Sequence, residues 1–272
     1  MSLALRRSAR RWYGDTSVYA RDPALPAFMT DLARPWGLPW QPEVLEAGLG
    51  QTYGEMAEQL LPEVVRADEP VDVLVLAFGV HDVRPGRSAA TYLSSICPGE
   101  PNAFAICEQG TLAPFTALRL IRSYAGSGRG VLVVAEQSTL HYPPAADVVL
   151  PERHAAVTLL FDPAGAGRLA AVRQHAGLST VEDTLAAEVA ALAGDRGDAI
   201  LLTGPGLAGI AAPDGVKHFP GPAGQPHTGP WWQLLDHDSG LVLVADADAG
   251  ELGLAAFDFT PADPTPHGGP PR

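Results

Sequence analysis

The sequence predicts an α/β fold of layered sheets and helices, made of two duplicated halves. A helix with a capping signal, an acidic turn and an apolar strand occur in residues 52–79 and again in residues 179–204. Residues 130–136, Gly-Val-Leu-Val-Val-Ala-Glu, are echoed by residues 240–246, Gly-Leu-Val-Leu-Val-Ala-Asp. An internal duplication is the simplest account, and it predicts two similar halves facing each other across a pseudo-twofold axis. Continuous apolar strands without polar alternation indicate mixed, mainly buried sheets.

The composition fits a globular protein and argues against several classes of partner. The chain has 272 residues, 46% of them hydrophobic and 18% charged, which allows a sizeable core. A net charge of −13 argues against nucleic acid, because phosphate binding needs a basic surface. The longest apolar runs have the length of strands, so no membrane span is expected. Two cysteines and no visible signal peptide lead us to expect a reducing, cytoplasmic location.

The elements of the first half are predicted from apolar runs, helical spacing and turn residues. Thr52 and Glu55 have the spacing of a capping box and begin a helix. The arginines near the N-terminus are interpreted as a solvated basic patch, with a site for a phosphate-bearing ligand as the alternative; they are Arg6, Arg7, Arg10 and Arg11. The other expected elements are strands at 3–5, 71–79, 103–106 and 131–136, and helices at 87–96 and before Tyr124.

The second half repeats this pattern in shortened form. We divide the chain into an N-terminal half at residues 1–150, a C-terminal half at 151–260 and a Pro- and Gly-rich disordered tail at 261–272. Residues 169–174 are predicted to pair with the strand at 155–161 as a hairpin. The other expected elements are a capped helix after Thr180 and strands at 148–150, 199–203 and 240–246.

Cys107 is the candidate nucleophile. It follows the strand at 103–106 directly and precedes a stretch with helical spacing, at or just before a helix N-terminus. The N–H groups and the dipole of a helix N-terminus favour negative charge, so the pKa of this thiol is expected to be lowered. A small buried core cysteine is the alternative interpretation.

The motifs on either side of Cys107 follow a definite order. The strand at 71–78, an Ala-rich helix and the phrase Ala103-Phe104-Ala105-Ile106-x-x-x-Gly110 lead to the strand at 131–136. This order resembles the first half of a ketoacyl-ACP synthase III-like protein of the thiolase superfamily, over about residues 50–260. The family phrase reads roughly afdi-x-x-x-Cys-x-Gly, whereas here Cys107 follows Ile106 directly and Gly110 comes three residues later. The resemblance implies a thiolase-like αβαβα layered fold, with Cys107 as the nucleophile.

The second half departs from the family pattern in its polar groups. The family has a His at the end of the strand that is here 199–203, but this chain reads Thr-Gly-Pro at 203–205. The family's Gly-Asn/His-Thr phrase is matched best by Gln-Pro-His-Thr at 225–228, which makes His227 the second catalytic residue. The Gly-rich loop that supplies an oxyanion-hole N–H corresponds to Asp-Ala-Asp-Ala-Gly at 246–250, where two carboxylates have replaced glycine.

The resemblance implies acyl transfer through a cysteine–histidine pair. Cys107 would take an acyl group from an acyl-CoA or acyl-carrier-protein thioester, with His227 as base and His218 as the competing candidate. Because the first family His is missing, the enolate pocket for decarboxylative condensation is incomplete. We therefore expect transfer of the acyl group to a heteroatom of a small-molecule acceptor in specialised-metabolite biosynthesis. The alternative is a catalytically degenerate partner subunit of an active ketosynthase-like chain.

The remaining predictions concern substrate, cofactor and assembly. The residues predicted to contribute to substrate binding are His81, Gly204, Gly250 and Trp231. No cofactor and no metal are expected. Thiolase-fold proteins pair through the strand before the nucleophile, so a homodimer, or a heterodimer with a ketosynthase-like chain, is expected through residues 102–106.

A Gly-x-Gly-x-x-Gly pattern at residues 204–209 is the motif of a different class of function. It would suggest a dinucleotide site if a helix began there and an acidic residue followed about twenty residues later. Pro213 and the turn after it cut such a helix short, so acyl transfer is preferred to dinucleotide binding.

Overall fold

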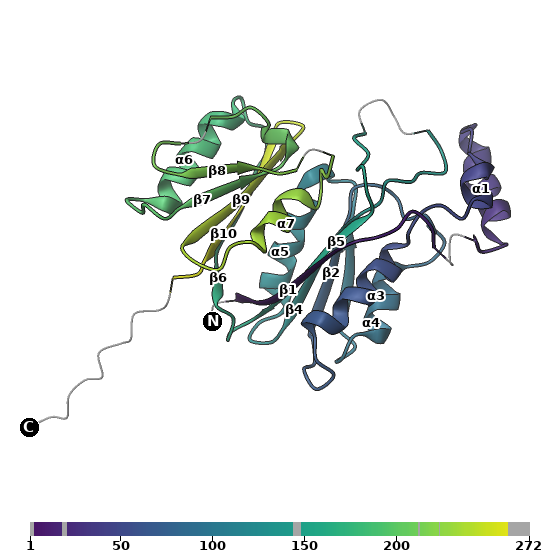
Figure 1. Cartoon of the computed structure of the whole chain (residues 1–272), viewed down its shortest axis with the longest axis horizontal. Coiled ribbons are helices and arrows are strands. Elements are labelled where there is room, and N and C mark those ends of the chain that lie inside the picture. The colour runs from purple at the N-terminus through teal and green to yellow at the C-terminus, as the bar shows by residue number, and fades with distance from the viewer. Residues whose placement is uncertain (1–2, 18–20, 144–147, 212, 223, 261–272) are drawn as a thin grey trace, which may run out of the picture.

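Ten strands form one mixed sheet in the computed structural model, in the order β3-β2-β4-β5-β1-β6-β10-β9-β7-β8 (Figure 1). The structure describes residues 3–17, 21–143, 148–211, 213–222 and 224–260. The strands are β1 (Ala4–Trp12), β2 (Val73–Ala77), β3 (Asn102–Ile106), β4 (Gly130–Glu136), β5 (Ala155–Asp162), β6 (Gly167–His175), β7 (Ile200–Thr203), β8 (Lys217–Pro220), β9 (Leu241–Asp248) and β10 (Glu251–Asp258).

Seven α-helices and three short 3₁₀ turns connect the strands in the described residues. The α-helices are α1 (Leu25–Ala33), α2 (Pro42–Glu46), α3 (Tyr53–Val64), α4 (Ala89–Ile96), α5 (Ala113–Tyr124), α6 (Val181–Ala193) and α7 (Gly229–Leu234). The 3₁₀ turns are η2 (Arg34–Trp36), η3 (Gly110–Leu112) and η4 (Pro205–Leu207). None of these helices has the length and apolar character needed to cross a lipid bilayer.

The strand order confirms the predicted duplication. Outward from the centre, the first series runs β1, β5, β4, β2, β3 and the second runs β6, β10, β9, β7, β8. Parallel and antiparallel pairings agree between the two series. Helices α3 and α6 precede equivalent strands, and α5 and α7 do likewise, but α4 has only the three-residue turn η4 as its counterpart. The second half is therefore shorter between β7 and β8.

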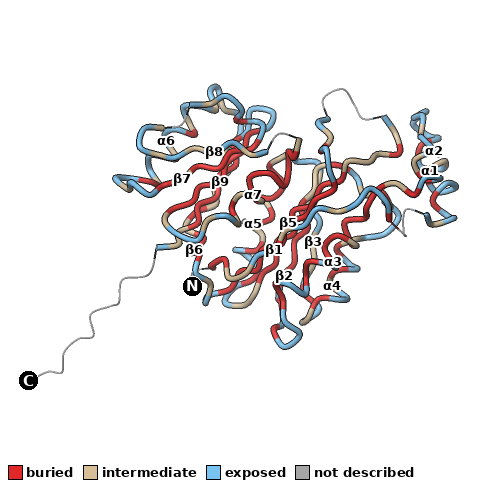
Figure 2. The backbone as a smooth tube through the Cα atoms, viewed as in Figure 1, coloured by how far each residue is buried: buried red, intermediate tan, exposed pale blue. Residues whose placement is uncertain are grey.

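The two series of strands and the helices packed on them form five layers, as the buried apolar side chains show. Helices α5 and α7 share one core cluster with strands of both series, so these two helices form the central layer. Helices α3 and α4 cover the outer face of the first series. Helix α6 covers the outer face of the second. The αβαβα architecture predicted from the sequence is thus confirmed, and the buried backbone follows the strands in Figure 2.

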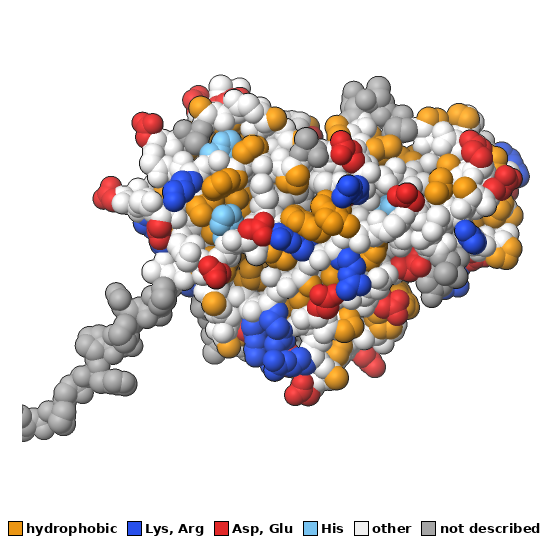
Figure 3. Space-filling view, viewed as in Figure 1, with side chains coloured by type: hydrophobic (Ala, Val, Ile, Leu, Met, Phe, Trp, Pro, Cys, Tyr) orange, Lys and Arg blue, Asp and Glu red, His pale blue; other side chains and the backbone are white. Residues whose placement is uncertain are grey.

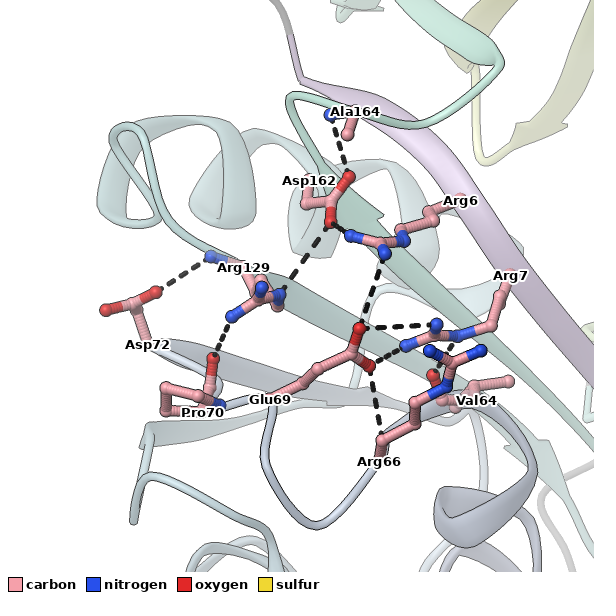
Figure 4. A network of polar contacts seen from close by, with 10 residues as sticks. All are labelled: Arg6, Arg7, Val64, Arg66, Glu69, Pro70, Asp72, Arg129, Asp162 and Ala164. Carbon is pink, nitrogen blue, oxygen red and sulfur yellow. Dashed lines mark hydrogen bonds and ion pairs between the residues drawn. The ribbon is translucent and has the colours of Figure 1, made fainter.

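Strand β1 is nine residues long, which corrects the short strand expected at residues 3–5. Its arginines are not a solvated patch. Arg6 pairs with Asp162 and Glu69, and Arg7 also pairs with Glu69 (Figure 4). Arg10 pairs with Asp236 and Arg11 with Glu63. These ion pairs satisfy the charges of a strand that contacts β5 on one side and β6 on the other.

Three further local predictions are wrong. Residues 169–174 lie in β6, but β6 pairs with β1 and β10, because β1 lies between β5 and β6 in the sheet. Residues 148–150 form no strand. The capping box of Thr52 and Glu55 is confirmed, but the second capping-box pattern, at residues 179–182, is not. The N-cap residue there is Thr180, whose hydroxyl donates to Asp183 and makes no cap.

The predicted division between the halves at residues 150 and 151 stays a prediction. By strand order β5 goes with the first series, which ends at Asp162. The predicted tail at residues 261–272 lies outside the described residues.

Candidate active site

Cys107 lies in the loop between β3 and η3. It follows Ile106, the last residue of the strand, and helix α5 begins only at Ala113. Its side chain is half-buried and forms no disulfide. Burial, together with the negative charge of Glu108, raises the pKa of the Cys107 thiol above its ordinary value. The predicted position at the helix N-terminus and the predicted lowering of the pKa are therefore both wrong.

Gly110 is the residue that begins the helical turn. Its φ of +49° lies in the left-handed region, where L side chains are disfavoured. A side chain on Gly110 would also overlap the Asp248 carboxylate, which comes from the end of β9 in the other half. Three residues separate Ile106 from Gly110, which is the spacing at which the related family phrase has its cysteine. Gly110 thus has no side chain, and the Asp248 carboxylate lies in the space that one would take.

His227 is the second predicted catalytic residue, and its imidazole lies between two loops of the first half. A side chain on Gly79, just after β2, would overlap this ring. A backbone hydrogen bond with Gly110 acts on the pKa of the ring. The residue is 6% exposed, and Nδ1 has no partner among the described residues. Burial lowers the pKa of His227 to about 4, although the Gly110 backbone acts in the opposite direction. The imidazole is therefore neutral at pH 7.

Glu136, at the end of β4, holds the loop that carries His227. Its carboxylate accepts hydrogen bonds from the backbone N–H of His227 at 2.9 Å, from Gln225 Nε2 and from the Thr228 hydroxyl. Burial raises the pKa of Glu136 to about 7, against the effect of these donors. Glu136 thus positions His227 across the junction between the two halves.

Asp246 occupies the equivalent place near the end of β9 and is 1% exposed. Its Oδ1 accepts from the backbone N–H groups of Gly206 at 3.0 Å and Ala247 at 2.8 Å. Its Oδ2 and the hydroxyl oxygen of Thr111 are both buried, and Thr111 lies close enough to lower the pKa of Asp246 as a hydrogen-bond donor. Burial raises the pKa of Asp246 to about 7. In each half, then, a buried carboxyl at a strand end faces the loop before a central helix of the other half.

A polar cavity of about 600 Å³ borders this region. Gly110 and Asp248 line it together with Gln109, Arg119 and His175. Cys107 does not contribute to its described lining, and neither does His227. The cavity therefore opens beside Gly110 and Asp248 and not onto a cysteine–histidine pair.

The other predicted site residues are dispersed. Gly204 belongs to the site, because a side chain there would overlap Asp246. Gly250 lies in the β9–β10 turn with open space around it, and Trp231 is buried against Phe115 with ring centroids 5.2 Å apart. His81 is exposed at the mouth of a different cavity.

His218, the competing base, lies on β8. Its Nε2 is 2.8 Å from the hydroxyl of Thr203, at the end of β7. Burial lowers the pKa of His218. His218 thus brings an imidazole to the hydroxyl at the end of the neighbouring strand.

Sequence reasoning assigned no role to Gly110 or Glu136. The spacing of the motif could have drawn attention to Gly110. The family phrase has its cysteine four residues after the apolar run, and Gly110 is the fourth residue after Ile106. The echo between residues 130–136 and 240–246 aligned Glu136 with Asp246 and could have identified the pair. Nothing in the sequence indicated that Asp248 would reach Gly110.

Solved structures share this fold. The acyltransferase ChlB3 aligns with a TM-score of 0.63 and 16% identity over 96% of this chain and 99% of its own. The tetronic acid condensing enzyme AbyA1 aligns with a TM-score of 0.61 and 16% identity, over 94% and 99%. The 3-oxoacyl-(acyl carrier protein) synthase III FabH of Pseudomonas aeruginosa aligns with a TM-score of 0.62 and 14% identity, over 97% and 100%.

The fold is therefore that of ketoacyl-ACP synthase III-like and related thiolase-fold proteins, and these structural neighbours include acyltransferases and condensing enzymes. No family model matches the sequence, and no curated protein sequence matches it. At these identities the likeness establishes the fold.

Proposed function

We propose that this chain is a thiolase-fold subunit that does not carry out condensation itself and that pairs with an active ketosynthase-like chain. One observation carries the proposal: the Asp248 carboxylate occupies the space that a side chain at position 110 would take. We infer that position 110 corresponds to the family's nucleophile, because the related family phrase has its cysteine four residues after the apolar run, where this chain has Gly110. No thiol can stand there without moving Asp248. The central helices and their supporting carboxyls remain, so the scaffold is kept while the reacting group is missing.

The electrostatics around Gly110 also oppose acyl-transfer chemistry. A thioester carbonyl under attack develops negative charge and needs hydrogen-bond donors around it. Here Asp248 brings a carboxylate to that place, and Asp246 presents a second carboxyl beside Thr111. These groups disfavour an oxyanion at this position.

Strand β3 supports pairing with a second chain. The amide of Asn102 donates to Asp72, and the carbonyl of Ile106 accepts from Phe78, so alternate residues of β3 face β2. The backbone groups of Ala103 and Ala105 consequently point away from the sheet, on an edge without charge or proline. The opposite edge, β8, carries Lys217 and Pro220, which protect an edge strand from further pairing.

Acyl transfer through Cys107 is the second candidate. The observation that favours it is that this thiol is half-buried, unpaired and three residues before Gly110, so a donor could reach it. In that reaction the thiolate attacks the thioester, the donor thiol leaves, and a heteroatom of the acceptor later takes the acyl group from sulfur. The donor would be an acyl-CoA or an acyl carrier protein. The acceptor would be a small molecule.

Intact-mass spectrometry with acyl-CoA and acyl-carrier-protein donors decides between the two. The wild type is compared with Cys107→Ser and with Cys97→Ser, which removes the other, buried cysteine. We expect no acyl adduct on any of the three. An adduct that Cys107→Ser abolishes and Cys97→Ser retains would establish the second candidate in place of the first.

A further inference from the structure

A cluster of arginines lies at the end of the sheet opposite to Gly110. Its members come from β1, from the loop between α3 and β2 and from the residue before β4; they are Arg6, Arg7, Arg66 and Arg129 (Figure 4). Strands β2, β3 and β4 are parallel and begin at this end, whereas Gly110 follows the far end of β3. Lys and Arg side chains also gather in a patch at the lower edge of the molecule in Figure 3. Such a cluster is unusual in a chain with a net charge of −13.

Two buried carboxylates hold three of these guanidinium groups in place. Glu69 pairs with Arg6 and Arg7, and its side chain is 9% exposed. Asp162 pairs with Arg6 and, at 3.7 Å, with Arg129, and its side chain is 4% exposed. The three arginine side chains are 21–29% exposed, so the positive groups lie at the surface and the negative groups beneath them. Three guanidinium groups share two carboxylates, which leaves positive charge at the surface.

Arg66 adds a guanidinium group that forms no ion pair with the described residues. Its backbone N–H donates to Glu69 at 3.4 Å, and its exposed side chain extends toward Arg7 in Figure 4. The other acids of the same loop, Asp68 and Asp72, form no ion pair with any of the four arginines in the part of the chain that the structure describes. Neighbouring guanidinium groups repel one another, so a further anion at this surface would be stabilised.

The chemistry and the surroundings of the cluster narrow the kind of anion. Arginine presents a planar fork of donors that fits a carboxylate or a phosphate, and the cluster already binds two carboxylates. None of the four arginines lines the cavities of about 350, 390 and 600 Å³, so the cluster offers a surface instead of an enclosed site for a small molecule. A long polyanion such as nucleic acid would extend beyond the cluster onto an acidic chain. A short acidic segment of a protein matches the charge without that repulsion.

We propose that this arginine cluster docks a short acidic segment of a partner protein, whose carboxylates bind Arg66 together with the partly exposed guanidinium groups of Arg6 and Arg7. The buried carboxylates keep the guanidinium groups of β1 oriented, so these side chains lose little conformational freedom on binding. The cluster lies at the far end of the sheet from Gly110 and includes no residue of β3. The inference therefore goes beyond the proposed function and does not depend on it.

Three labelled probes test the proposal. Tetraglutamate carries the acidic side chains, tetraglutamine has the same backbone without the charge, and an oligothymidylate of equal charge represents nucleic acid. Their dissociation constants are measured at pH 7.5 by fluorescence anisotropy with the full chain, at low and at high salt. At low salt we expect tetraglutamate to bind about tenfold more tightly than tetraglutamine, and we expect this preference to shrink at high salt, because ions screen exposed charges.

Two charge-reversal variants locate the binding. Arg66→Glu changes an exposed side chain without an ion pair to the described residues, so it carries little risk to folding, and it is expected to weaken tetraglutamate about fivefold or more at low salt. The matched control Arg34→Glu makes the same change of net charge on a side chain that is 70% exposed and outside the cluster, and it is expected to leave the affinity unchanged. Equal affinity for tetraglutamate and tetraglutamine, equal affinities of the two variants, or tighter binding of the oligothymidylate than of tetraglutamate would each overturn the proposal. So would displacement of tetraglutamate by an equal concentration of inorganic phosphate.

Discussion

Replacement of Gly110 measures how much free energy it costs to place a side chain in the space that Asp248 occupies. In Gly110→Ala the new methyl group meets two obstacles, a left-handed φ of +49° and the Asp248 carboxylate. The backbone obstacle costs roughly 1–2 kcal/mol for an L residue. The overlap adds up to about 1 kcal/mol, because Asp248 is an exposed, flexible side chain that can rotate away. We expect a total loss of about 1–3 kcal/mol in the free energy of unfolding.

The two contributions are separated by a matched glycine. Gly126 has a φ of +56°, and a methyl group added there would meet nothing within 4 Å, so Gly126→Ala reports the backbone cost alone. Urea unfolding of both variants, with and without Asp248→Ala, gives a double-mutant cycle. Asp248→Ala is expected to recover the excess loss in Gly110→Ala and to leave Gly126→Ala unchanged. Equal losses in the two glycine variants, or no recovery, would refute the contact between Gly110 and Asp248.

Three further predictions follow from the carboxyls, the edge strand and the thiol. Burial raises the pKa of Glu136 and Asp246 to about 7, so in the folded chain these two carboxyls hold protons that the unfolded chain releases. Their contribution to the free energy of unfolding falls as pH rises from about 4 to 7, whereas that of His227, whose pKa burial lowers to about 4, rises. Relative to the wild type, the free energy of unfolding of Asp246→Asn, measured in urea, is therefore expected to be higher at pH 7.5 than at pH 5. Ala105→Pro removes an outward N–H of β3. In the absence of another thiolase-fold chain, two copies of this chain are expected to pair through β3, so light scattering should give the monomer mass of 28.5 kDa for the variant and a larger mass for the wild type; equal masses contradict self-pairing through β3. Because its pKa is raised, Cys107 is expected to react with iodoacetamide several-fold more slowly than free cysteine at pH 7.5, and fast selective alkylation would contradict this.

The sequence carried the layered architecture because its strands are continuous apolar runs and its halves repeat. Strands β2, β4, β7 and β9 are buried on both faces, which removes polar alternation and makes them recognisable. Only the start of β1 was predicted, because its arginines are not typical of a buried strand. Glu69 and Asp162, which pair with these arginines, lie close to them only in the folded chain. Strand β1 also lies between β5 and β6 in the sheet, so these two strands do not form the predicted hairpin.

The site was predicted less well, since its decisive contacts join residues far apart in the chain. The motif phrase drew attention to Cys107, yet the residue that begins the helical turn is Gly110. The contact between Asp248 and Gly110 joins the two halves, and so does the hydrogen bond from the His227 N–H to Glu136. Spacing within one segment carries no information about such contacts, although the repeat aligned Glu136 with Asp246.

The most direct test restores the missing group. In a Gly110→Cys, Asp248→Gly variant, the thiol stands at the start of the helical turn, beside the His227 imidazole, and the carboxylate no longer fills its space. Intact-mass spectrometry with an acyl-CoA donor, followed by peptide mapping, is expected to find one acyl group at position 110 of the variant and none on the wild type. An adduct on Cys107 of the wild type, or none at position 110 of a folded variant, would contradict the account.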